Sequence, residues 1–326
     1  MKIEDLINLT MGELKSEPTI HSINSATVYL SKVEQGDLFI SDNKDDIYEA
    51  IDKGAYAIIY SDSSIEITDR EVAWILVEDI QKASFKILRF IALSREVVFY
   101  YFTDIELTFF KMFVSYKKSI VILSEEWRKI FETVLNSNSK LFIGTDKELL
   151  LSIKPDVQIL NPNASCEIIS DTLFRTTFKV GGFLYQEKEI TPSHVDYVQK
   201  VFEFCQKHNL LYDFDKVRYT KHFLPVFIDS KLNKIHSSKS EKVVIFTDNL
   251  RDIVLAREFV KYNGRWIKTV VLTPPKVKIE GFDKPIWYES SGHAREILKN
   301  THFNYAFVFG SDKSLLDSLK EEASLF

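Results

Sequence analysis

A turn with two threonines and an aspartate carries the side chains that a nucleotide site would need. Thr103, Asp104 and Thr108 follow the longest purely apolar run of the chain, residues 97–102. Hydroxyl and carboxylate oxygens at the end of a strand can hold Mg²⁺ and the phosphates that it accompanies. The alternative is a strand-to-helix turn in which Thr103 or Asp104 caps the helix. We prefer the cap, because a nucleotide-binding motif needs its structural context to confirm it.

A second polar group follows an apolar run near the C-terminal end. Asp248, Asn249 and Asp252 come directly after residues 242–246, and the segment 310–312 (G-S-D) follows residues 305–309. Open α/β sheets bind ligands at the carboxyl ends of their parallel strands. Asp and Asn are also common helix caps. Asp248 and Asn249 are therefore candidate ligand contacts, with capping as the alternative.

The rest of the sequence shows no metal site and no standard catalytic motif. The seven histidines have no ligand spacing, and neither Cys166 nor Cys205 has a neighbour that would complete a zinc site or a disulfide framework. The chain has ten glycines, and none of the patterns G-x-x-x-x-G-K-[ST], G-x-G-x-x-G or G-x-S-x-G occurs. We therefore assign no catalytic residue and expect no metal ion.

Charge and apolar patterning narrow the possible partners. Lys and Arg number 42 and Asp and Glu 47, which gives a net charge of −5. This mild acidity gives no basic footprint for nucleic acid or anionic lipid. No apolar stretch is long enough for a signal peptide or a membrane span. We expect a cytoplasmic protein of two or three domains.

Short apolar runs alternate with amphipathic stretches along the chain, which predicts an α/β fold. Strands this apolar, each followed by a helix, favour parallel sheets covered on both faces. The polar stretch 233–240 is the segment most similar to a linker. Predicted strands are 37–40, 57–60, 74–77, 97–102, 119–123, 141–143, 157–160, 242–246, 268–272 and 305–309, with a hairpin of 173–180 and 183–189 turned at Gly181-Gly182. Predicted helices are about 45–53, 80–92, 194–207 and 251–262, with others beginning near 107, 125, 147, 291 and 312.

Two N-terminal segments each contain a glycine in a longer pattern: V-E-Q-G-D-L-F-I at 33–40 and A-I-D-K-G-A-Y-A-I-I at 50–59. They resemble the V-x-P-G-D-L-F and A-I-x-x-G-A-x-A patterns of the Mur ligases of the MurE and MurF types, ATP-dependent enzymes that add amino acids to the UDP-linked peptidoglycan precursor. L-V-E-D at 76–79, K-P-D-V-Q-I-L at 154–160 and T-L-F-R-T-T-F at 172–178 keep the family's order. The resemblance implies three domains: an N-terminal domain at 1–93, a shortened, degenerate ATPase-like central domain at 94–232, and a Rossmann-like domain at 233–326.

The family's functional motifs are mostly absent. A Mur ligase holds ATP on T-G-x-x-G-K-T-T, where this chain has T-D-I-E-L-T at 103–108, without glycine or lysine. Asp104 and Glu106 would each oppose a phosphate by about 4 kcal/mol at ~4 Å and an effective dielectric constant near 20. The family's D-S-R falls on Y-L-S at 29–31. Of H-N-x-x-N only His194 is kept, as a candidate ligand contact or simply a residue of the helix start.

Three functional hypotheses follow. The first is a non-catalytic Mur ligase homologue that binds a UDP-linked peptidoglycan precursor or a cell-wall synthesis enzyme and needs no cofactor. The second is an active UDP-MurNAc-peptide ligase whose unconventional site takes ATP and Mg²⁺. The third is an interaction scaffold without a small-molecule ligand. The aromatic residues of 97–102, with Phe109 and Phe110, could form a partner surface or a buried strand and its packed helix.

Overall fold

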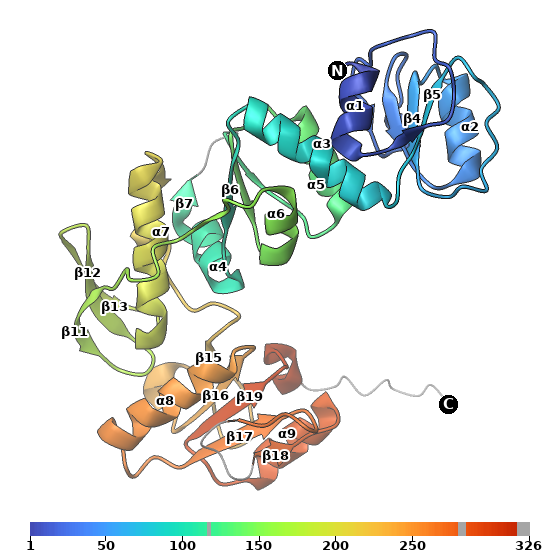
Figure 1. Ribbon diagram of the computed structural model, residues 1–326. Helices are drawn as coiled ribbons and strands as arrows, with labels where there is room; N and C mark the ends of the chain where they lie inside the picture. The colour runs from blue at the N-terminus through green and yellow to red at the C-terminus, as the bar shows by residue number, and fades with distance from the viewer. Residues whose placement is uncertain (116–118, 280–284, 318–326) are drawn as a thin grey trace, which may run out of the picture. The chain divides into compact units, whose positions relative to one another are not determined.

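The computed structural model describes residues 1–115, 119–279 and 285–317 (Figure 1). The chain divides into two compact units, Met1–Thr103 with Tyr116–Leu160, and Asp104–Ser115 with Asn161–Phe326. The three predicted domains, 1–93, 94–232 and 233–326, have other boundaries than these units and stay a prediction. Each unit contains parallel sheets and helices, so the predicted α/β class is confirmed.

The first sheet has the strand order β1-β5-β4-β3-β2, parallel except for β1. Because side chains alternate along a strand, Leu38 and Ile40 of β3 face helices α1 and α3, whereas Phe39 faces α2. Gly36 and Gly54, from the two motifs at 33–40 and 50–59, both have φ +94°, and the Gly36 N–H donates to the Gly54 carbonyl over 2.8 Å. The elements are α1 (Ile3–Thr10), β1 (Glu13–Leu14), β2 (Ala26–Thr27), η1 (Leu30–Lys32), β3 (Leu38–Ile40), α2 (Lys44–Asp52), β4 (Ala57–Tyr60), β5 (Ala73–Leu76) and α3 (Ile80–Ser94).

The second sheet of this unit is fully parallel, in the order β10-β6-β9-β8. The predicted aromatic strand is its β6, where Phe99 and Tyr100 are almost completely buried. Phe109 and Phe110 are also fully buried. Of the two alternatives for these aromatic residues, the buried strand with its packed helix is therefore confirmed. The elements are β6 (Val98–Tyr101), β8 (Ile120–Ile122), α5 (Trp127–Asn136), β9 (Leu141–Gly144), α6 (Lys147–Ile153) and β10 (Gln158–Ile159).

The second unit begins with helix α4 and includes a small antiparallel sheet, β11-β12-β13, packed on helix α7. The predicted hairpin is present, and Gly181 and Gly182 turn it with positive φ. Strands β7 and β14 form a two-residue antiparallel pair. The elements are α4 (Asp104–Phe113), β7 (Val114–Ser115), β11 (Glu167–Asp171), β12 (Thr176–Val180), β13 (Phe183–Lys188), η2 (Pro192–His194), α7 (Val195–Lys207), β14 (Leu211–Tyr212) and η3 (Phe214–Lys216).

The last sheet has the order β15-β16-β19-β17-β18, with β15 antiparallel to β16 and the other neighbours parallel. Alternate residues of β16 belong to two core clusters, one with residues of helix α8 and the other with residues of helix α9. The two helices therefore cover opposite faces of this sheet (Figure 1). Residues 233–240, expected as a linker, instead connect the paired strands β15 and β16. The elements are β15 (Leu224–Ile228), η4 (Ser237–Lys239), β16 (Lys242–Thr247), α8 (Leu250–Asn263), β17 (Thr269–Thr273), β18 (Ile286–Trp287), α9 (Ser291–Asn300), β19 (Tyr305–Phe309) and η5 (Lys313–Leu316).

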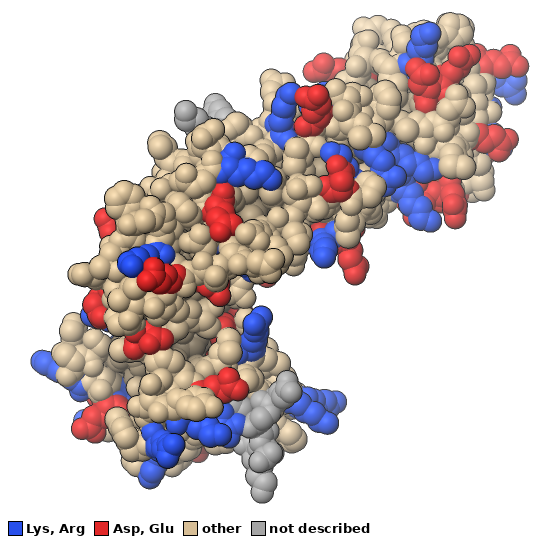
Figure 2. All heavy atoms as spheres, turned by 60° about the vertical axis from the view of Figure 1, so that its left-hand side comes forward, with Lys and Arg blue, Asp and Glu red and all other residues tan. Residues whose placement is uncertain are grey.

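The surface carries charges of both signs. Figure 2 shows acidic and basic side chains close to one another over much of the face in view. None of the helices in the described ranges combines the length and the apolar character that a bilayer crossing requires. The helix predicted to begin near 312 is the short η5 in its described part, and its remainder lies outside the described residues.

Candidate functional site

Thr108 and Asp248, which sequence analysis placed in separate candidate sites, lie on either side of one histidine in the second unit. The Thr108 hydroxyl is 3.1 Å from Nε2 of His222, and Nδ1 of His222 is 2.7 Å from Oδ1 of Asp248. Thr108 lies in α4, His222 precedes β15, and Asp248 follows β16. His222 is 2% exposed, whereas the Asp248 side chain is 49% exposed. Three segments that are distant in sequence therefore share one hydrogen-bonded chain.

His194, the candidate carried over from the family motif, forms a second buried histidine–aspartate pair. Its Nε2 lies 2.8 Å from Oδ2 of Asp252, and both side chains are almost completely buried. The Ser193 hydroxyl donates to the other oxygen of Asp252 over 3.3 Å. Asp248 lies in the turn between β16 and α8, and Asp252 lies in the first turn of α8, so one short segment supplies a carboxylate to each of the two histidines.

Aromatic rings surround His194 and exclude water from this pair. Phe109, Tyr197 and Phe223 each meet the imidazole edge to face, with ring centroids about 6 Å away. Burial, and then the negative charge of Asp252, raise the pKa of the Tyr197 hydroxyl. Phe223 directly follows His222, so the two histidine–aspartate pairs pack through neighbouring residues.

The N-terminal turn of α4 differs electrostatically from the expectation. Glu106 is 5% exposed and its carboxylate lies 3.6 Å from Nζ of Lys200 on α7. Asp104 is exposed at the first position of α4, where negative charge complements the helix dipole and water screens its field. The predicted repulsion of about 4 kcal/mol per carboxylate is therefore too large. Glu106 is compensated by a lysine that sequence reasoning did not identify.

The remaining predicted residues lie at turns and caps. Thr103 precedes α4 as the last residue of its segment of the first unit. Asn249 caps α8, because its side chain accepts a hydrogen bond from the Arg251 N–H over 3.0 Å. Asp312 caps η5 in the same way, accepting from the Ser314 N–H. The capping alternative is confirmed for Asn249.

The order hydroxyl, imidazole, carboxylate could in principle polarise the Thr108 hydroxyl. Thr108 lies in the interior of α4, however, where the backbone N–H groups are used by the helix and none is left to bind an oxyanion. Within the described ranges, no three His, Cys, Asp or Glu side chains gather in a way that could hold a metal ion. The cluster consequently has the character of a satisfied polar network that joins α4, α7 and α8.

A buried carboxylate in the first unit was missed by sequence analysis. Glu132 of α5 is 4% exposed and accepts from the Thr27 hydroxyl at 2.5 Å, the Val28 N–H at 2.9 Å, Lys32 Nζ at 2.9 Å and Asn136 Nδ2 at 3.2 Å. We call this set of contacts the Glu132 clasp. It engages residues 27–32, the segment on which the family's D-S-R pattern falls.

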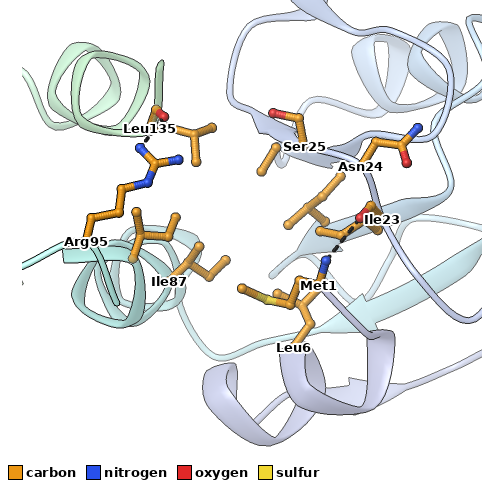
Figure 3. Close-up of a pocket in the computed structure, with 11 residues that line it drawn as sticks. Met1, Leu6, Ile23, Asn24, Ser25, Ile87, Arg95 and Leu135 are labelled. Atoms are coloured by element: carbon orange, nitrogen blue, oxygen red, sulfur yellow. Dashed lines mark hydrogen bonds between the residues drawn. The ribbon is translucent and has the colours of Figure 1, made fainter. Parts of the chain in front are cut away.

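A small cavity lies between α1, α3 and α5 of the same unit (Figure 3). Its volume is about 160 Å³, below the range of roughly 300–1,000 Å³ that is usual for small-molecule sites. The Met1 amino group donates to the Ile23 carbonyl over 3.1 Å, and Arg95 donates to the Leu135 carbonyl over 2.8 Å. The two charged groups at its rim, the Met1 amino group and Arg95, thus already have partners.

Comparison with known proteins identifies the fold. No family model matches the chain, and no curated protein matches it. Among solved structures, it is similar to the MurF ligase from Thermotoga maritima in complex with ADP, at 10% identity and a TM-score of 0.50, covering 90% of this chain and 95% of that one. It is also similar to MurF from Acinetobacter baumannii, at 10% identity and a TM-score of 0.48, covering 94% and 95%. The chain therefore has the Mur ligase fold, which confirms the resemblance found at residues 33–59.

Proposed function

We propose that this protein is a non-catalytic relative of the Mur ligases that acts by binding a UDP-linked peptidoglycan precursor or a cell-wall synthesis enzyme in the cytoplasm. The shared fold with MurF supports a relationship to enzymes of this class. Fold alone is compatible with many activities, so the argument depends on the site.

The observation that carries the proposal is the state of the turn at 103–108. A phosphate-binding loop needs glycines so that backbone N–H groups can close on the ligand, and a basic side chain to face its charge. This turn has neither. Two of its side chains have partners inside the protein, Glu106 with Lys200 and Thr108 with His222. A triphosphate at this position would have to displace both.

Calorimetric titration of the full chain with ATP and Mg²⁺, and separately with UDP-MurNAc-pentapeptide, tests the proposal. We expect no heat from the nucleotide and saturable binding of the precursor. Thr108→Val removes the hydroxyl at nearly constant shape, so it should leave precursor affinity unchanged. Micromolar ATP affinity that Thr108→Val weakens would refute the proposal and support an active ligase that uses ATP and Mg²⁺.

The Glu132 clasp favours a second candidate function, a scaffold without a small-molecule ligand. The donors at Thr27, Val28 and Lys32 are held by a protein carboxylate and are not open to an incoming anion. If the scaffold function holds, neither ATP nor the precursor binds, and cell-wall enzymes co-purify with the wild-type chain. Precursor binding in the titration above excludes this candidate.

A further inference from the structure

A cavity in the second unit has a mainly apolar and aromatic wall that also contains the polar residues Thr191, Ser193 and Glu258. It has a volume of about 310 Å³ and lies between helix α8, the short η2 turn and Leu173. Leu255, Phe259 and Tyr262 contribute to its lining from α8 at spacings of four and three residues, so they form one stripe of the helix. The volume is at the lower end of the range for small-molecule sites and suits a ligand the size of one sugar ring.

Thr191 supplies an unused polar group. It is 2% exposed and occupies the N-cap position of η2, yet its hydroxyl makes no capping hydrogen bond. A threonine at an N-cap normally satisfies a backbone N–H with this oxygen. Within the described ranges, the only completely enclosed side-chain polar atom without a partner is the Thr273 hydroxyl. The Thr191 hydroxyl is therefore not fully enclosed, and Thr191 is one of the residues that line the cavity.

The aromatic side of the cavity is available to a ligand. Tyr262 is 81% exposed, an unusual value for an aromatic side chain, and Phe259 is half-buried beside it. An exposed tyrosine offers a flat apolar face together with a polar tip. The ring face of a pyranose, with its axial C–H groups, is complementary to such a surface.

The charge distribution selects against a cationic ligand. Glu258 is exposed and is the carboxylate that α8 contributes to the lining. Arg257 and Lys261 flank it on the same helix, so the wall does not carry a strong negative field. One carboxylate, one free hydroxyl and an aromatic face suit a neutral ligand that bears several hydroxyl groups.

We propose that this cavity binds a single neutral sugar ring, with Tyr262 and Phe259 against its apolar face and with Thr191 and Glu258 bonded to its hydroxyl groups. The site is distinct from the turn at 103–108 and from the histidine–aspartate cluster. If the proposed function holds, this sugar belongs to the precursor that the protein binds.

Saturation-transfer NMR and calorimetry with the methyl glycoside of N-acetylglucosamine test the site on the full chain. Thr191→Val and Tyr262→Ala should each weaken binding about tenfold, from loss of a hydrogen bond and of the stacking surface. Thr191→Ser keeps a hydroxyl and should restore most of the affinity, which a merely structural role of the side chain would not require. Trp287→Ala is the matched control, because Trp287 is 57% exposed and does not line the cavity.

Two results overturn the inference: no saturation transfer from the wild-type chain to the glycoside, or equal affinities of wild type, Thr191→Val and Tyr262→Ala. Titration of the same variants with UDP-MurNAc-pentapeptide separates this failure from that of the proposed function. Precursor binding that the variants leave unchanged removes the sugar site and keeps the proposed function. Glycoside binding that the variants weaken, without precursor binding, keeps the site and removes the proposed function.

Discussion

The Glu132 clasp gives a prediction whose size follows from the burial of its donors. In Glu132→Ala four donors lose their acceptor. Lys32 is 52% exposed and Asn136 is exposed, so both regain water at little cost. Thr27 is 3% exposed and the Val28 N–H is buried, and an unsatisfied buried donor costs about 1–3 kcal/mol.

The Thr27 hydroxyl has a partial substitute, the Tyr29 carbonyl at 3.4 Å, so its contribution lies at the low end. We therefore expect Glu132→Ala to lower the free energy of unfolding by about 3 kcal/mol, close to the lower limit for breaking a buried charged pair. For a unit of about 150 residues this corresponds to a fall in Tm of roughly 10 °C.

Urea unfolding followed by tryptophan fluorescence measures this change, and Trp127 reports it from the same helix as Glu132. Glu132→Gln keeps an acceptor for Thr27 and Val28 and should cost less than half as much. Glu148→Ala removes an exposed glutamate of α6 and should stay within about 0.5 kcal/mol of wild type. A loss below 1 kcal/mol for Glu132→Ala would refute the view that the clasp stabilises this unit.

Two further predictions concern the second unit. Asp252→Ala leaves His194 and Ser193 without their buried acceptor, so it should lower the free energy of unfolding of this unit by about 3–5 kcal/mol, measured with guanidinium. Ser193→Ala removes only one hydrogen bond of 3.3 Å and should cost about 1 kcal/mol. Similar losses for the two variants would contradict the paired geometry. Burial raises the pKa of the Cys205 thiol from 9.0 to about 12, and burial together with Asp196 raises the pKa of the Cys166 thiol to about 11. Both thiols should therefore react with Ellman's reagent at pH 8 much more slowly in the native chain than in the unfolded chain. Rapid labelling of the native chain at pH 8 would contradict this burial. Above pH 9 the unfolded chain releases the thiol protons while the folded chain holds them, so the free energy of unfolding should fall as the pH rises from about 9 to 12.

The alternation of apolar runs and amphipathic stretches was sufficient to predict most of the fold. Strands such as β4 and β9 were predicted because parallel strands buried on both faces are continuous apolar runs. Strand β15 was missed, since Pro225 interrupts its pattern and it lies at the edge of its sheet, where proline is tolerated. The stretch 233–240 was mistaken for a linker because the polar connection of two paired strands has the same composition as a linker.

The candidate site was only partly predictable for a different reason. Thr108, His194 and Asp248 were identified because local motifs and strand ends mark them. Their partners have no local mark, since His222 precedes an unpredicted strand and Lys200 lies on a helix face whose neighbour is set by tertiary packing. The one available signal was the position of Asp248 and Asp252 just after the apolar run that forms β16, because the carboxyl ends of parallel strands are where polar side chains gather.

The partners of α4 bear on what a nucleotide site at this turn would require. A polar group that no longer contacts a ligand must be satisfied by water or by the protein when it is buried. Here Lys200 compensates Glu106 and His222 bonds Thr108, while Asp248 orients the imidazole from the far side. Adding a lysine to the turn would place a second cation near Lys200, and adding glycines would leave His222, the partner of Thr108, in place. A single substitution therefore cannot turn residues 103–108 into a phosphate-binding loop, because the glycines and the lysine are all missing and two side chains already have partners elsewhere in the protein.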